Sequence, residues 1–203
     1  MAISILMILS YLIGAIPFAF IFTKLVAGTD VRKIGSGNVG ATNTSRILGL
    51  KYGVVVGILD VLKGFLAVFL LQLLLPENAS EYWILVGAVL SIIGHNWSIF
   101  LKFTGGKGVA TTFGVVLRTL PLVFIICTVL IWLIVVVATK YVSLASMLGA
   151  ISLPIQIIIL RRNPYFFIFA VILALFIVVR HHSNIKRLFQ GCERRLSWPA
   201  RSK

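Results

Sequence analysis

The sequence predicts an all-α integral membrane protein, a bundle of about seven transmembrane helices of which one is short. Two observations predict it. Apolar residues make up 60% of the 203-residue chain, charged residues only 12%, and the mean hydropathy is +1.07, whereas a soluble domain carries about twice that charged fraction. Charge-free intervals long enough to cross a bilayer also recur along the chain, with no soluble domain or linker between them. We therefore expect one transmembrane helical domain over residues 1–203.

Four or five intervals are clear spans, because a transmembrane helix needs about 20 mostly apolar residues. They cover residues 3–23, 82–101, 119–139, 141–160 and, slightly shorter, 163–179. The first is too long and wrongly flanked for a cleaved signal peptide, so we expect it to be retained. A further interval, 52–75, is apolar except for Asp60 and Lys63. These two residues are three positions apart, so they share a helical face and can neutralise each other.

The interval 109–117 is the short one, and it could be a half-span, a tilted short helix or a surface loop. The distribution of basic residues decides the count, because short cytoplasmic loops are enriched in Lys and Arg. With seven crossings and the N-terminus outside, 15 of the 19 basic residues lie on the cytoplasmic side. Six crossings would place the basic C-terminal tail outside. We therefore predict seven spans, an external N-terminus and a cytoplasmic C-terminus.

Acidic residues are scarce, with five carboxylates against 19 Lys and Arg and a net charge of +14. A mechanism that needs a carboxylate cluster is therefore hard to supply. In a chain this apolar, the positive charge favours anionic lipid or a phosphorylated substrate over nucleic acid as partner. Cys127 lies in an apolar run and Cys192 in the basic tail, so neither a disulfide nor a metal-binding cysteine pair is indicated. We expect no metal and no cofactor.

Three polar segments carry the chemistry, and the seven-span scheme puts all of them on the cytoplasmic side. The first is the glycine-rich loop 35–46, whose opening six residues match the G-x-G-x-x-G dinucleotide pattern. That pattern has meaning only after a strand of a β-α-β unit, so we discard the dinucleotide interpretation. The glycines still let backbone N–H groups approach an anion, and hydroxyls, amides and the Arg46 guanidinium add donors. The alternative is an ordinary surface loop.

The second segment runs from Gly94 and His95 to the sequence Gly105-Gly106-Lys107-Gly108. Residues 109–117 follow at once, so the positive end of a short helix would face the same anion as the Lys107 ammonium. The alternative is a turn at the membrane surface, with Lys107 reaching to lipid headgroups and His95 only an interfacial histidine.

The third segment is the run 180–188 at the inner end of the last span. On a continuing helix His181 and Asn184 share a face, whereas His182 points about 100° away. Adjacent histidines without a nearby carboxylate or thiolate lack the ligands for a metal. Taken alone, the run is also typical of a basic stop signal. Between the fifth and sixth spans, Ser143 could donate to a ligand or only to its own helix.

Taken together, these segments closely resemble the three motifs of the bacterial acyl-phosphate-dependent glycerol-3-phosphate acyltransferases. The resemblance runs from the first span to the last. Two positions depart from the family's pattern: Ser98 stands where proline is common, and Ser183 where an acidic residue is common. The residues that carry the resemblance are Gly35-Ser36-Gly37-Asn38, Gly40-Ala41-Thr42-Asn43 and Arg46, then Gly94-His95 and Gly105 to Thr111, then His181, Asn184-Ile185 and Arg187.

The resemblance implies transfer of a fatty acyl group from acyl phosphate to the 1-hydroxyl of sn-glycerol 3-phosphate, giving lysophosphatidate and phosphate. This is the first step of phospholipid synthesis, at the cytoplasmic face of the bacterial cytoplasmic membrane. The residues implied in catalysis are Ser36, Ser143, His181 and Asn184. Those implied in substrate binding are Gly35, Gly37, Asn38, Gly40, Thr42, Asn43, Arg46, His95, Gly105, Gly106, Lys107 and Gly108.

Our hypothesis for the mechanism is that His181, held by Asn184 or Ser143, removes the hydroxyl proton. In a second version a phosphate oxygen of a substrate removes it and His181 only orients. The membrane acyltransferases that use His-x-x-x-x-Asp are excluded, because no Asp follows a histidine at that spacing. The alternative function is an organic-phosphate transporter with Asp60 and Lys63 on its permeation path. It ranks second because the other spans are nearly devoid of charge.

Overall fold

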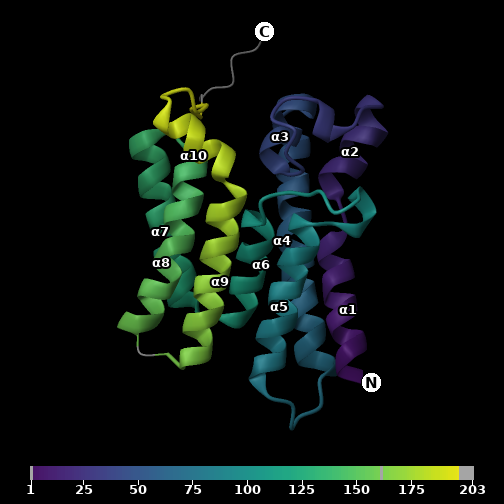
Figure 1. Ribbon diagram of the computed structural model, residues 1–203, viewed down its shortest axis with the longest axis vertical. Helices are drawn as coiled ribbons and strands as arrows, with labels where there is room; N and C mark the ends of the chain where they lie inside the picture. The colour runs from purple at the N-terminus through teal and green to yellow at the C-terminus, as the bar shows by residue number, and fades with distance from the viewer. Residues whose placement is uncertain (1, 161, 197–203) are drawn as a thin grey trace. The chain divides into compact units, whose positions relative to one another are not determined.

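The computed structural model describes residues 2–160 and 162–196 (Figure 1). In this part of the chain every regular element is helical, apart from one isolated β-bridge between Ser98 and Thr104. The helices fall into two compact units, within Met1–Thr119 and within Leu120–Lys203. The single domain expected over 1–203 stays a prediction, and its last seven residues lie outside the described ones.

Unit 1 is built on two helices, α1 and α4, which both pack against α5. The Ser10 hydroxyl of α1 donates to the Gly87 carbonyl of α5 at 2.6 Å, and the Tyr11 hydroxyl donates to the Trp97 carbonyl at 2.8 Å. The elements of this unit are α1 (Ala2–Ala15), α2 (Phe18–Ala27), η1 (Val31–Lys33), α3 (Ala41–Leu48), α4 (Leu50–Leu74), α5 (Glu81–Asn96), η2 (Ile99–Leu101) and α6 (Val109–Thr119).

The first span is interrupted between α1 and α2. Pro17 has no N–H and cannot continue the hydrogen bonds of α1, so the helix stops at Ala15 and restarts at Phe18. The two pieces together form one apolar stretch, Ile3–Ala27. Breaking a helix inside a membrane leaves carbonyl groups without helical partners, and these must find other donors.

The short interval 109–117 forms helix α6, so it is not a surface loop. Its 11 residues span roughly 17 Å, about half of the hydrocarbon core of a bilayer. The helix packs closely on α4: a Cβ added at Gly114 would collide with the Val61 carbonyl, and one at Gly64 would collide with the Thr111 carbonyl. Small residues at such contacts let two membrane helices approach backbone to backbone.

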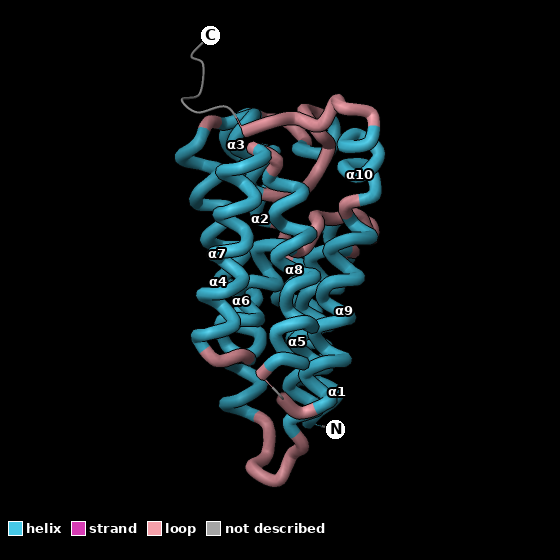
Figure 2. The backbone as a smooth tube through the Cα atoms, turned by 90° about the vertical axis from the view of Figure 1, so that its left-hand side faces the viewer, coloured by secondary structure: helices cyan, strands magenta, loops and turns pink. Residues whose placement is uncertain are grey.

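Unit 2 is a group of three long helices with a bent end, and both views show α7, α8 and α9 side by side (Figures 1 and 2). Polar side chains link α8 to α7: the Gln156 amide donates to Thr128 at 3.1 Å, and the Trp132 indole donates to Ser146 at 3.4 Å. Its elements are α7 (Leu122–Thr139), α8 (Val142–Ile159), α9 (Pro164–Arg180) and α10 (His182–Phe189).

Four helical stretches of the described chain are long and apolar enough to cross a membrane, namely Ile3–Ala27, Leu50–Leu74, Leu122–Thr139 and Val142–Ile159. A fifth is added if α9 and α10, which meet at a bend of 60°, count as one span. With 16 and 11 residues, α5 and α6 are shorter. The predicted all-helical membrane architecture is confirmed, whereas the number seven and the orientation of the termini stay predictions.

Candidate active site

Asn43 shapes the first glycine-rich segment. Its side chain is fully buried at the start of α3, where its Oδ1 accepts a hydrogen bond of 2.9 Å from the Ser36 N–H. Its Nδ2 donates to the carbonyls of Val31 and Ile34, both at 3.0 Å. Gly35 lies in the left-handed region at φ +68°, which L side chains rarely adopt, and lets the chain turn around the Asn43 amide. The sequence predicts a substrate ligand at Asn43, but its side-chain hydrogen bonds hold the loop.

The donors that this loop exposes are Ser36, Thr42 and Arg46, with Asn38 half-buried beside Gly40. Asp30, the carboxylate that precedes this loop in the chain, is held at 2.6 Å by the Arg32 guanidinium. That side-chain hydrogen bond keeps the pKa of Asp30 below its ordinary value. Asp30 is therefore charged but neutralised locally, and it does not cancel the positive field of the segment.

The second segment folds back over the end of α5. The Ser98 N–H donates to the Thr104 carbonyl at 3.2 Å, and the Gly106 N–H donates to the His95 carbonyl at 3.1 Å. A Cβ added at Gly106 would collide with Nε2 of His95 and with the Val39 carbonyl of the first segment. Gly106 therefore lies where the two glycine-rich segments meet, and the half-buried Lys107 follows directly. Helix α6 begins two residues later, at Val109.

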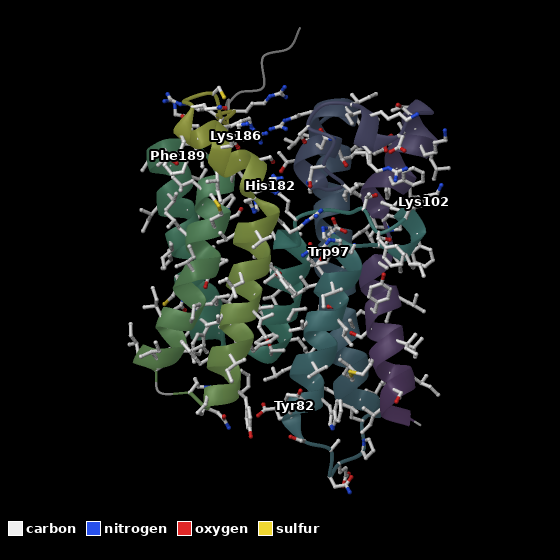
Figure 3. The ribbon with its side chains drawn as sticks, in the orientation of Figure 1. Tyr82, Trp97, Lys102, His182, Lys186 and Phe189 are labelled. Carbon is white, nitrogen blue, oxygen red and sulfur yellow. The ribbon has the colours of Figure 1, made fainter. Side chains whose placement is uncertain are left out.

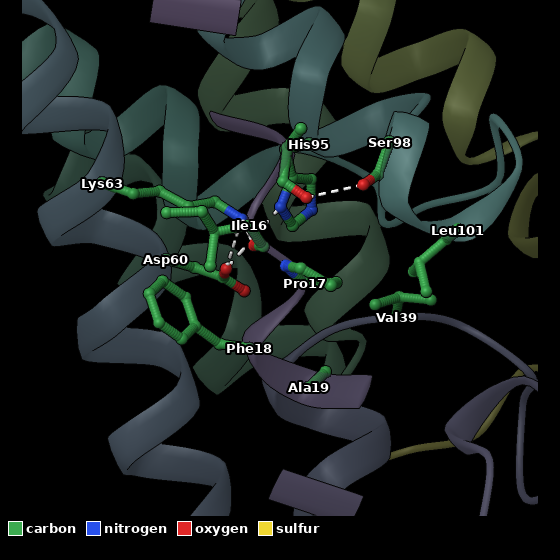
Figure 4. A pocket seen from close by; sticks show the side chains of 11 residues that line it. Ile16, Pro17, Phe18, Ala19, Val39, Asp60, Lys63, His95, Ser98 and Leu101 are labelled. Atoms are coloured by element: carbon green, nitrogen blue, oxygen red, sulfur yellow. Dashed lines mark hydrogen bonds and ion pairs between the residues drawn. The ribbon is translucent and has the colours of Figure 1, made fainter. Parts of the chain in front are cut away.

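Beneath this meeting point lies a buried group of charged and polar side chains (Figure 4). The Lys63 ammonium is 2.8 Å from Asp60 Oδ1, as the spacing of the two residues predicts. The same carboxylate oxygen is 3.7 Å from Nδ1 of His95. Lys63 also donates to the Ile16 carbonyl at 2.8 Å. A cavity of about 10 Å³ lies among these residues, room for about one water molecule.

Ser98, one of the departures from the family pattern, has a defined partner. Its hydroxyl donates to the Ala15 carbonyl at 2.6 Å, and its side chain is buried. Ala15 is the last residue of α1, so Ser98 supplies a donor to the break in the first span.

In unit 2 two of the predicted catalytic residues, Ser143 and Asn184, bind the carboxylate of Glu193. This carboxylate accepts hydrogen bonds from the Ser143 hydroxyl at 2.7 Å, the Asn184 amide at 2.6 Å and the Arg187 guanidinium at 2.7 Å. Burial opposes its ionisation, but the three donors outweigh that effect and hold the pKa of Glu193 below its ordinary value. Glu193 is thus an ionised acceptor that ties the start of α8 to α10.

Sequence reasoning missed this role of Glu193, which it counted only among the five carboxylates. A signal was present: Glu193 is the one carboxylate in the basic tail after Arg180 and stands nine residues beyond Asn184. A single acid among so many cations indicates a specific partner, because a tail that only follows the positive-inside bias has no need of it.

His181 lies at the bend between α9 and α10 and is 3% exposed. Its Nδ1 is 2.7 Å from the Ile177 carbonyl. Because a carbonyl only accepts, Nδ1 carries the proton in this arrangement, and Nε2 is the nitrogen that can accept one. The Ile177 carbonyl orients the ring. The Ser143 hydroxyl and the Asn184 amide both donate to Glu193, and their expected role in holding the His181 ring stays a prediction. The next residue, His182, is exposed on α10 (Figure 3).

Each unit thus brings together its own set of predicted residues. Unit 1 joins the loop around Ser36 and Asn38 to Gly105, Gly106 and Lys107, with His95 beneath them. Unit 2 joins Ser143 and Asn184 through Glu193, with His181 one turn before Asn184. In the described residues no group of three or more His, Cys, Asp or Glu side chains is placed to hold a metal ion.

A family model described as glycerol-3-phosphate acyltransferase matches residues 4–191. A relative named glycerol-3-phosphate acyltransferase from Desulforamulus reducens is 46% identical over 91% of this chain and 90% of its own length. A relative with the same name from Fusobacterium nucleatum is 41% identical over 98% of this chain and 100% of its own.

Two solved structures have the same fold. One is a crystal structure of PlsY, an integral membrane glycerol 3-phosphate acyltransferase, in its glycerol 3-phosphate form. It has a TM-score of 0.89 and 36% identity, covering 97% of this chain and 96% of that one. The lysophosphatidic acid form of PlsY has a TM-score of 0.85 and 35% identity, over the same shares of the two chains.

Proposed function

The chain belongs to the glycerol-3-phosphate acyltransferase family, and on that premise we propose that its acyl donor is acyl phosphate. The products are then lysophosphatidate and inorganic phosphate. The observation that carries this proposal is the meeting of two donor-rich segments at Gly106, next to Lys107. Glycerol 3-phosphate and acyl phosphate are both phosphorylated anions, and such a place suits either of them.

We assign phosphate binding to the first two segments. Ser36 and Thr42 offer exposed hydroxyls, and Arg46 offers a guanidinium that can hold two phosphate oxygens at once. Lys107 adds an ammonium at the start of α6, whose helix dipole favours an anion at the same end. Asn43 and Gly106 contribute by shaping the two backbones rather than by contacting the substrate.

The reaction itself is a direct acyl transfer. The hydroxyl oxygen of glycerol 3-phosphate attacks the carbonyl carbon of acyl phosphate, and the bond from that carbon to the phosphate oxygen breaks. Phosphate leaves with the electron pair, and the hydroxyl proton passes to Nε2 of His181 or to a phosphate oxygen. Phosphate is a good leaving group, so no strong acid is required, and nearby cations can balance its charge.

The acyl chain needs an apolar place next to the phosphate-binding segments. A groove of about 480 Å³ runs along α4 and α6 in unit 1 and is lined only by apolar residues. One of them, Ala110, is two residues after Gly108, so a chain in the groove would lead away from the anion-binding loop. The lining residues are Val54, Gly57, Ile58, Val61, Leu62, Ala110 and Phe113.

We retain seven crossings, with the N-terminus outside and the active site at the cytoplasmic face of the bacterial cytoplasmic membrane. The helices support this count if α1 with α2, and each of α4, α5, α6, α7, α8 and α9, crosses once. The exposed Cys192 gives a test. A membrane-impermeant thiol reagent should modify it in inverted vesicles and leave it unmodified in intact spheroplasts, and the reverse pattern would overturn the orientation.

The decisive experiment gives detergent-purified protein glycerol 3-phosphate together with palmitoyl phosphate or palmitoyl coenzyme A. Phosphate release that requires both glycerol 3-phosphate and palmitoyl phosphate is expected. Equal or faster transfer from the coenzyme A thioester would overturn the choice of donor. Lys107→Met should abolish most of the activity, whereas the matched variant Lys51→Met, at an exposed lysine of α4, should keep it.

The organic-phosphate transporter is the alternative function. It requires a polar path through the bilayer at Asp60 and Lys63, but these side chains bind each other and the Ile16 carbonyl. The cavity beside them, about 10 Å³, is too small for an organic phosphate. This supports the enzyme. Uptake of glycerol 3-phosphate into liposomes that contain the protein would support the transporter.

A further inference from the structure

Acyl transfer at the glycine-rich segments makes no use of the charges buried beneath them. Asp60 and Lys63 lie inside unit 1 with side chains 4% and 3% exposed. Burying charge in a membrane protein is costly, so buried charged residues usually have a functional role. The partners of Asp60 and Lys63 indicate which role they have.

Two donors hold the interruption of the first span. Lys63 donates to the Ile16 carbonyl at 2.8 Å, and Ser98 donates to the Ala15 carbonyl at 2.6 Å. Both carbonyls lie at the break that Pro17 causes between α1 and α2. We call this break the joint. It is fixed because Lys63 of α4 and Ser98 of the turn after α5 each bind a different carbonyl there.

His95 connects this joint to the anion-binding backbone. Its Nδ1 faces the Asp60 carboxylate at 3.7 Å. On the other side of the ring, Nε2 lies so close to Gly106 that no Cβ fits between them. The Val39 carbonyl of the first loop also lies so close to Gly106 that a Cβ there would collide with it. An unbroken series of contacts therefore runs from the joint through Lys63, Asp60 and His95 to the point where the two loops meet.

We propose that Asp60 and Lys63 are positioning residues: through His95 they fix the backbone of Gly106 against Val39 and so preorganise the phosphate-binding segments. This rests on the proposed function, because it takes those segments as the phosphate site. Preorganisation matters here because donors on glycine-rich backbone lose much conformational freedom when an anion orders them. If the backbone is already fixed in the folded protein, this conformational freedom is lost on folding rather than on binding. The anion then binds more tightly.

The test compares Asp60→Asn and His95→Phe with wild type. Asp60→Asn keeps the shape of the side chain and removes its charge, and His95→Phe keeps a ring and removes both nitrogens. Ser91→Ala is the matched control, because Ser91 is buried on α5, the helix that carries His95, and its hydroxyl donates to the Ala88 carbonyl of the same helix. For each protein we would measure kcat and KM for glycerol 3-phosphate, and amide hydrogen exchange by mass spectrometry.

In Asp60→Asn and His95→Phe the KM for glycerol 3-phosphate should rise about tenfold or more, with kcat changed less than about threefold. Exchange should speed up in segments 35–40 and 104–109 and stay slow in the middle of α4 and α5. The control should match wild type in both measurements. An unchanged KM, a fall in kcat alone, or faster exchange spread evenly over α4 and α5 would each overturn the proposal.

These outcomes separate the inference from the proposed function. If wild-type protein transfers no acyl group to glycerol 3-phosphate, the function fails. The exchange comparison still decides the positioning role, because it needs no substrate: protected loops in wild type and unprotected loops in both variants would support it, and equal protection would overturn it.

Discussion

The side-chain amide of Asn184 donates a hydrogen bond of 2.6 Å to the carboxylate of Glu193. The same carboxylate accepts hydrogen bonds from Ser143 on α8 and Arg187 on α10. One acid in the tail thus sets the positions of two residues that the sequence predicts to be catalytic. Hydrogen bonds to a charged group are stronger than those between neutral groups. Loss of this carboxylate should therefore weaken the positioning of Ser143, Asn184 and Arg187.

Replacing Glu193 by Gln should destabilise the protein by about 1–3 kcal/mol and remove most of the acyl transfer. The new amide keeps one acceptor oxygen but turns an NH₂ group toward Arg187, so one of the three hydrogen bonds is replaced by a clash of donors. Thermal unfolding in detergent and the rate of phosphate release would measure the two effects. Glu81→Gln, at an exposed acid in the first turn of α5, is the control, and a Glu193 variant that behaves like it would contradict the prediction.

The contribution of Glu193 should depend on pH in one direction. Its pKa is lower in the folded protein than the ordinary value of 4.5, because three donors outweigh its burial. A carboxyl group of this kind stabilises fully above the ordinary value, and its contribution disappears as the pH falls through the lower folded pKa. The difference in Tm between wild type and Glu193→Gln should therefore be constant near neutrality and shrink in acid. A difference that grows in acid would show that the carboxyl is protonated in the folded state.

Gly106→Ala should abolish activity, because there is no room for a methyl group at this position. The added Cβ would collide with the His95 ring and the Val39 carbonyl, and the backbone carbonyl cannot move aside without shifting the first loop. Gly149→Ala is the matched control, since the nearest atom to its Cβ would be 3.6 Å away, an ordinary contact. Acyl-transfer rates of the two variants in the same membranes would test this. Activity near that of wild type in Gly106→Ala would mean that the two loops are not in contact as described.

Local patterns in the sequence were sufficient for several features. The spacing of Asp60 and Lys63 predicts their ion pair, since residues three apart on a helix share a face. A short helix was one of the three paths left open for residues 109–117, and the structure has α6 there, at Val109–Thr119. The ion pair could be predicted because it is an interaction within a few residues, where helix geometry determines which side chains lie close together.

Contacts between distant elements could not be predicted in this way. His95 and Asp60 lie 35 positions apart and meet only because α4 packs against α5. Asn43 has the side chain of an anion ligand, but the sequence does not say that its amide turns inward to hold residues 31, 34 and 36. Residue type indicates which hydrogen bonds a side chain can make, and tertiary packing decides which it does make.

His181→Ala should lower kcat at least about 100-fold if Nε2 takes the hydroxyl proton. The Ile177 carbonyl holds the ring by Nδ1 at 2.7 Å, so Nε2 is the basic nitrogen in the arrangement observed. His182→Ala is the natural control: this neighbour is exposed, its Nδ1 is 3.1 Å from the Val179 carbonyl, and it is not among the predicted site residues. It should keep activity within about threefold of wild type.

His181→Gln separates the two versions of the mechanism. A glutamine amide can orient a substrate through a hydrogen bond but cannot accept a proton at neutral pH. If a substrate phosphate takes the proton and His181 only orients, the glutamine variant should recover much of the activity that alanine loses. If His181 is the base, glutamine and alanine should be equally inactive across the pH range. Alanine activity within about threefold of wild type at every pH would remove both roles, and the proton would then have to pass directly between the substrates.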